Sequence, residues 1–184
     1  MKHFHFEPET DGFYGAYWEN TTQTDAALIV MLGDDPEDHM CKACVRWLQN
    51  DGFNVLSMSP AKKDYGHHNY PLERIETAIQ WLKEHGNKKI GIVGASTTGM
   101  LALVAASHFP DITLTLAFTP SDFVWQGFMQ GKKDGCKEWP IPGESTVSYH
   151  GKPIPYMPFV YQHPEYWHVV EQSSKEHKDL LHSR

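Results

Sequence analysis

Cysteine is scarce in this chain, with three in 184 residues, and only Cys41 and Cys44 stand close together. Because a second close pair is missing, the pattern argues against a zinc site built from two cysteine pairs. The two residues also fall inside a stretch with helical periodicity, which favours two half-buried side chains on one helix face over a metal or redox role. The 12 histidines are scattered and form no H-E-x-x-H or comparable spacing. We therefore predict no metal and no cofactor.

Basic clusters and long hydrophobic runs are also lacking. The chain has 16 Lys and Arg against 23 Asp and Glu, for a formal net charge of −7, and its basic residues form no block longer than two. It offers no footprint for a phosphate backbone, so nucleic acid is not an expected partner. The apolar run 26–32 is far short of the roughly 20 residues that a membrane span needs, and the N-terminus has no apolar signal core. We expect a soluble, cytoplasmic protein without a membrane partner.

The first two thirds of the chain alternate strand patterns with helix patterns, which is typical of a parallel sheet with helices on both faces. Hydrophobic residues make up 40% of the sequence, enough for one core in a domain of this size. We predict a single α/β domain over 1–184, in which 119–162 is an irregular, lid-like excursion and 165–181 returns to helix. The expected strands are 4–6 and 13–18 as an antiparallel hairpin, then 26–32, 53–58, 89–93 and 112–118, and the expected helices are 36–50, one that starts at Pro71, and 100–108.

One segment, residues 94–99 with the sequence Gly-Ala-Ser-Thr-Thr-Gly, carries recognisable chemistry. It resembles the nucleophile elbow, a strained strand-to-helix turn that lifts a serine above the sheet edge, and this predicts Ser96 as a catalytic nucleophile. The segment departs from G-x-S-x-G because Thr98 replaces the second glycine, and we expect this β-branched residue to crowd the turn. The alternative is a glycine-bearing turn in another doubly wound protein, with Ser96 capping the helix. The G-x-G-x-x-G of a dinucleotide site is absent.

Ester chemistry at Ser96 also needs hydrogen-bond donors for the developing oxyanion. In an elbow of this kind one donor is the backbone N–H after the nucleophile, and the other comes from the loop after an earlier central strand, here residues 33–36. We therefore predict the backbone N–H groups of Asp34 and Thr97 as the pair. The carboxylates of Asp34 and Asp35 would oppose a negative charge, so we expect them to point outward or to meet a cation. Both acids also suit the start of the next helix.

The order of these pieces resembles the α/β-hydrolase superfamily, and more narrowly its dienelactone-hydrolase-like branch, which includes acyl-CoA thioesterases and bile acid-CoA:amino acid N-acyltransferases. The layout agrees over about 26–181, most specifically in the strand, elbow and helix of 89–107. The resemblance implies hydrolysis of an ester or thioester through a Ser96 acyl-enzyme, since in this branch serine accompanies hydrolysis and cysteine accompanies acyl transfer. It also implies a later strand with the triad acid and then the histidine. Nothing after Phe159 matches these, so we expect a truncated domain that lacks the C-terminal strands and is nearly inactive by itself.

Two alternatives stay open at this stage. A histidine already present in the chain, His67 or His68, would serve as the base if the triad has a different chain order. Otherwise the chain is a non-catalytic scaffold that acts as a binding or interaction module, and an exposed sheet edge then favours a homo-oligomer. Aromatic residues of the C-terminal third suit either an acyl pocket or a lid packed on its own domain. They are Trp125, Trp139, Tyr149, Tyr156, Phe159 and Trp167.

Overall fold

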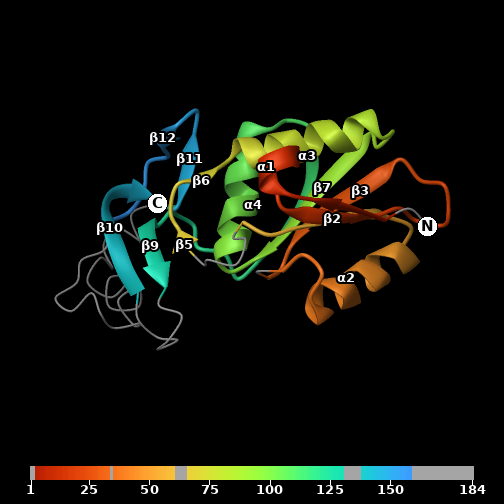
Figure 1. The fold of residues 1–184 in the computed structure, drawn as a ribbon, viewed down its shortest axis with the longest axis horizontal. Helices are drawn as coiled ribbons and strands as arrows, with labels where there is room; N and C mark the ends of the chain where they lie inside the picture. The colour runs from red at the N-terminus through yellow and green to blue at the C-terminus, as the bar shows by residue number, and fades with distance from the viewer. Residues whose placement is uncertain (1–2, 34, 61–65, 131–137, 159–184) are drawn as a thin grey trace. The chain divides into compact units, whose positions relative to one another are not determined.

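The chain folds into two compact units, shown in Figure 1. The first unit holds the largest sheet and the four helices of the described residues, and the second holds two small sheets. The units comprise Met1–Asp64 with Leu72–Asp122, and Tyr65–Pro71 with Phe123–Arg184. The computed structural model describes residues 3–33, 35–60, 66–130 and 138–158.

The first unit is built on a six-stranded sheet in the order β1-β2-β4-β3-β7-β8. β2 runs antiparallel to both of its neighbours, β1 and β4, and the other neighbouring pairs are parallel. The structure therefore confirms the predicted opening hairpin and the mostly parallel sheet. The strands are β1 (His3–Phe6), β2 (Gly15–Trp18), β3 (Ala26–Met31), β4 (Asn54–Met58), β7 (Lys89–Ala95) and β8 (Ile112–Phe118).

The helices start close to the predicted positions, with differences that have local causes. α2 (His39–Asn50) begins after Asp38, whose side chain accepts a hydrogen bond from the backbone N–H of Cys41. α3 (Glu73–Glu84) begins two residues after Pro71, because Pro71 pairs with another strand in the second unit. α4 (Thr97–His108) begins directly after the elbow, earlier than the predicted residue 100. A further short helix, α1 (Pro8–Asp11), lies within the opening hairpin.

Helices cover both faces of the large sheet, with α2 on one side and α3 and α4 on the other (Figure 1). The alternation of side chains along the strands decides which face each residue joins. On the α2 face, Val45 and Leu48 pack into a buried cluster with Ala16, Trp18, Leu28, Val30, Val55 and Val93. On the other face, the Trp81 ring of α3 makes edge contacts with the rings of Phe6 and Tyr17. The core thus forms directly from the apolar strand patterns.

The second unit corrects one expectation, since proline-rich residues 139–158 contain strands where the sequence predicted no regular element. Its sheets have the orders β10-β9-β5 and β12-β11-β6. Proline is compatible with β10 because this strand lies at a sheet edge, where a missing N–H breaks no pairing with a second neighbour. The strands are β5 (Gly66–His67), β6 (Tyr70–Pro71), β9 (Gln126–Gln130), β10 (Glu138–Ser145), β11 (Val147–Tyr149) and β12 (Lys152–Pro153).

Two features of the described residues bear on partners. β8 is the terminal strand of the six-stranded sheet, and its side chains Leu114, Leu116 and Phe118 are exposed. None of the helices in these parts of the chain combines the length and the apolar character that a membrane crossing requires.

Candidate active site

Ser96 is the single residue between β7 and α4. Its backbone has φ 55° and ψ −120°, a conformation that non-glycine residues rarely adopt and that stores strain. The residue is exposed. The structure therefore confirms the predicted geometry, in which a sharp strand-to-helix turn presents the serine to solvent.

On the strand side of this turn only glycine fits, because the backbone of α4 approaches residue 94 too closely for a side chain. A Cβ atom on Gly94 would lie 2.1 Å from the backbone oxygen of Thr98 and 2.9 Å from the backbone nitrogen of Gly99, which no side chain tolerates. The backbone N–H of Ser96 donates to the carbonyl oxygen of Phe118 at 2.9 Å, which ties the elbow to β8. Backbone packing on both sides thus holds Ser96 in its strained conformation.

Thr98 does not crowd the turn, contrary to the expectation from its β-branched side chain. Its Oγ1 lies 2.6 Å from the carbonyl oxygen of Met31 and 2.8 Å from that of Ala95, and it accepts the Ala95 backbone N–H at 3.0 Å. The hydroxyl therefore bonds to the carboxyl ends of both β3 and β7. In this chain a threonine at the position of the second glycine acts as a polar link between the strands.

The Ser96 hydroxyl does not serve as a helix cap. Ser96 stands at the N-cap position of α4, yet its side chain makes no capping hydrogen bond. The alternative in which Ser96 only caps the helix is therefore wrong. Thr97 is the first residue of α4, where a backbone N–H has no intrahelical acceptor and the helix dipole favours negative charge. This position suits the predicted role of the Thr97 N–H as an oxyanion donor, which stays a prediction.

The loop after β3 lies at the same sheet edge as the elbow. Met31 of β3 pairs with Gly94 of β7 in the parallel register. Gly33 comes two residues after Met31, and Ser96 comes two residues after Gly94, so the two segments leave the sheet at the same level. Asp34, the predicted second oxyanion donor, lies outside the described residues, and its role stays a prediction. Asp35 is exposed, and its Oδ1 accepts the backbone N–H of Glu37 at 2.8 Å, so this carboxylate helps to form the turn before α2.

The histidines proposed as alternative bases, His67 and His68, belong to the second unit, whereas Ser96 belongs to the first. Burial lowers the pKa of His67 to about 4. The centroid of its ring lies 4.9 Å from the centroid of the Phe128 ring. The His68 Nδ1 atom lies 3.1 Å from the carboxylate of Glu144. A role for either histidine in a reaction at Ser96 stays a prediction.

Of the aromatic residues predicted to line an acyl pocket, some lie within the described residues and others do not. Trp125 is buried in a small cluster with Phe128, against which Phe123 and Met157 pack, so this aromatic ring has a packing role in its own unit. The predicted helix 165–181, together with Phe159 and Trp167, lies outside the described residues. The acyl pocket that these aromatics suggested therefore stays a prediction.

The two neighbouring cysteines of α2 are both at least partly shielded from solvent. Cys41 is buried and Cys44 partly buried, and neither forms a disulfide. Burial raises the pKa of the Cys41 thiol to about 11 and raises that of Cys44 as well. Both side chains thus favour the thiol over the reactive thiolate.

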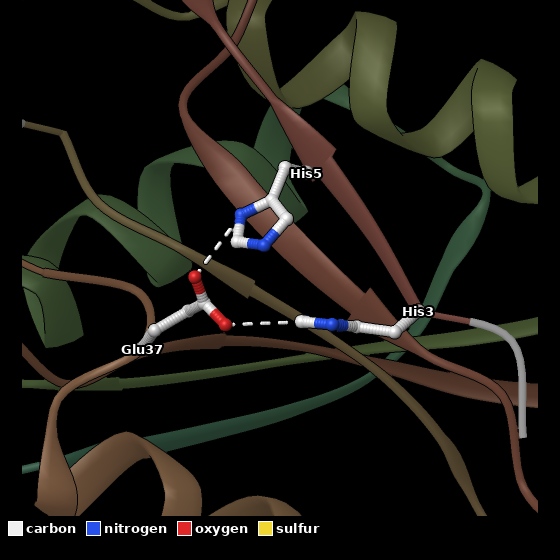
Figure 2. A group of neighbouring side chains, drawn as sticks. All are labelled: His3, His5 and Glu37. Carbon is white, nitrogen blue, oxygen red and sulfur yellow. Dashed lines mark ion pairs between the residues drawn. The ribbon is translucent and has the colours of Figure 1, made fainter.

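Sequence reasoning missed one cluster that the fold assembles. His3 and His5 of β1 and Glu37 of the turn before α2 bring their side chains together (Figure 2). The available signal was the alternation of His3 and His5, which puts both on one face of a strand, but nothing in the sequence connects them to Glu37.

Comparison with known proteins bears on the fold and the elbow region. A family model described as BAAT / Acyl-CoA thioester hydrolase C terminal matches residues 70–166, a range that includes Ser96. No curated protein sequence matches the chain.

Several solved structures are similar in part. Est1E from Butyrivibrio proteoclasticus has 17% identity and a TM-score of 0.49, with 60% of this chain and 48% of that one covered. An esterase from Pyrococcus furiosus has 20% identity and a TM-score of 0.47, with 59% and 44% covered. A Klebsiella pneumoniae protein described as a dienelactone hydrolase has 10% identity and a TM-score of 0.46, with 94% and 93% covered. The chain thus spans about half the length of the two esterases that it matches.

Proposed function

Because the chain belongs to the BAAT / acyl-CoA thioester hydrolase C-terminal family, we propose that it hydrolyses esters or thioesters through an acyl-enzyme on Ser96. The α/β-hydrolase architecture predicted from the sequence agrees with this family and with the mostly parallel sheet. The observation that carries the proposal is the exposed Ser96 at a strained turn, since a capping or packing serine needs neither feature.

The proposed reaction has two steps. In the first, Ser96 Oγ attacks the carbonyl carbon of the substrate, its proton passes to a base, and the tetrahedral oxyanion collapses with loss of the alcohol or thiol. In the second, water attacks the acyl-serine, and the carboxylic acid leaves as Ser96 regains its proton. The Thr97 N–H at the start of α4 is a suitable donor to the oxyanion, because the helix dipole adds to its hydrogen bond.

The substrate class follows from the family rather than from a described pocket. We propose an acyl thioester or a plain ester, with the serine favouring water over an amino acid as the acceptor. A histidine is the proposed base. The proton acceptor need not be known for the central claim to be tested, because only an activated serine reacts with a fluorophosphonate.

The test compares two matched variants of one helix region. Ser96→Ala is expected to abolish fluorophosphonate labelling and to remove the weak p-nitrophenyl ester or acyl-CoA turnover expected of this chain. Ser107→Ala is the control, because Ser107 is an exposed serine of α4 whose Oγ donates to the carbonyl oxygen of Val104. Its labelling and turnover should match the original chain within about twofold.

A second candidate function is a non-catalytic interaction module that keeps the hydrolase scaffold. It is favoured by the exposed apolar side chains of β8, the terminal strand of the sheet, since such an edge promotes pairing with another copy of the chain. Absence of Ser96 labelling in a folded chain that is dimeric by light scattering would support this module and overturn the hydrolase proposal.

A further inference from the structure

We propose that His3, His5 and Glu37 form a binding site for a divalent transition-metal ion, with Zn²⁺ as the representative ligand. Figure 2 shows both imidazole rings turned toward the Glu37 carboxylate, each beside one of its two oxygen atoms. The site involves none of the residues assigned to ester chemistry, so it is independent of the proposed function.

The distances match the donor spacing that a small ion requires. His3 Nε2 lies 3.1 Å from Glu37 Oε1, and His5 Nδ1 lies 3.0 Å from Glu37 Oε2. Two ligands of a tetrahedral zinc ion with bonds of about 2.0–2.1 Å are about 3.4 Å apart. The candidate ligand atoms of the three residues all lie within 4.8 Å of one another, so small side-chain rotations bring them around one ion.

The backbone brings the two histidines to one face. In the β1–β2 register His3 pairs with Trp18 and His5 with Ala16, and both of these β2 residues belong to the buried cluster on the α2 face. The His3 ring also stacks on Trp18, with centroids 5.0 Å apart and an interplanar angle of 25°. This stacking limits the orientations of His3 before any ion arrives, which lowers the entropy cost of binding.

Glu37 is held by a separate structure on the same face. Its backbone N–H donates to Asp35 Oδ1 at 2.8 Å, and the next residue, Asp38, caps α2. The carboxylate is partly buried, with 23% of the side chain exposed, whereas His3 and His5 have 36% and 62% exposed. An ion therefore reaches the site from solvent and meets an anchored carboxylate.

The donor set selects the class of metal. Two imidazole nitrogens and one carboxylate oxygen suit zinc, copper, nickel and cobalt, whereas magnesium and calcium prefer oxygen ligands alone. A simple surface ion pair is the competing explanation. It would account for one imidazole beside Glu37, but exposed pairs contribute little to stability and give no reason for two rings to converge on one carboxylate.

The test is a calorimetric titration of the chain, produced without a polyhistidine tag, with ZnCl₂ and separately with MgCl₂. We expect one Zn²⁺ per chain, no detectable Mg²⁺ binding, and an increase in Tm with Zn²⁺ concentration, because the ion joins β1 to the turn before α2. Co²⁺ should give the visible absorption of a site with nitrogen and oxygen ligands.

Variants decide whether these residues are the ligands. His3→Asn, His5→Asn and Glu37→Gln should each weaken Zn²⁺ binding at least about tenfold, while His108→Gln, which changes an exposed histidine at the end of α4, should leave it unchanged. Glu37→Gln keeps the size of the side chain, so it is informative even if a β1 variant folds poorly. No zinc binding, or binding that all three variants retain, would overturn the proposal.

Discussion

The hydroxyl oxygen of Thr98 lies 2.6 Å from the backbone carbonyl oxygen of Met31, which joins the first turn of α4 to the end of β3. The same hydroxyl contacts both backbone polar groups of Ala95 at the end of β7. One side chain, two residues after the elbow serine, thus connects two adjacent parallel strands. The threonine at this position therefore makes hydrogen bonds that a glycine could not make.

Replacing Thr98 with valine should destabilise the protein by about 1–3 kcal/mol, because the isosteric side chain leaves the Ala95 N–H without its acceptor and removes a donor from the strand ends. Urea denaturation followed by circular dichroism measures the change. Thr98→Ser keeps the hydroxyl and should lose less than about 1 kcal/mol. Equal losses in the two variants would show that the methyl group, and not the hydrogen bonds, matters at this position.

Replacing Gly94 with alanine should cost more than about 3 kcal/mol and reduce the yield of folded protein, since the new Cβ would lie 2.1 Å from the Thr98 backbone oxygen. Gly86→Ala is the control. Gly86 has φ 86° but no atom within 4 Å of an added Cβ, so only backbone strain of about 1–2 kcal/mol applies there. The ratio of the two losses separates the steric contact from the conformational effect, and comparable losses would argue against the contact.

The partly buried ring of His67 should make stability depend on pH. Its pKa is about 4 in the folded protein and about 6.5 in an unfolded chain, so between these values the unfolded state binds more protons. The stabilisation is complete above pH 6.5 and is lost as the pH falls toward 4, by up to about 3 kcal/mol. The difference in unfolding free energy between the original chain and His67→Gln should therefore change over this window. Parallel curves from pH 7 to 4 would contradict the prediction, and NMR titration of the His67 ring provides an independent check.

The elbow was predictable from the sequence because its determinants are local. Gly94, Ser96 and Thr98 lie within one turn, and the exclusion of a side chain at Gly94 arises from atoms four residues away. The strand 112–118 was predicted with the bounds that the structure has, since its β-branched and apolar residues favour a strand in any context. Thr98 shows the limit, because its partner Met31 comes from a different strand and could not be identified locally.

Two features could be known only from the tertiary structure: the position of β10 at a sheet edge, and the meeting of His3 and His5 with Glu37. The prolines of β10 predicted an irregular segment, and only the place of that strand at a sheet edge makes them compatible with pairing. Sequence alternation by itself puts His3 and His5 on one face of a strand. The meeting of these rings with Glu37 was decided by the pairing of β1 with β2 and by the turn that caps α2, because long-range backbone hydrogen bonds set distances that no local pattern encodes.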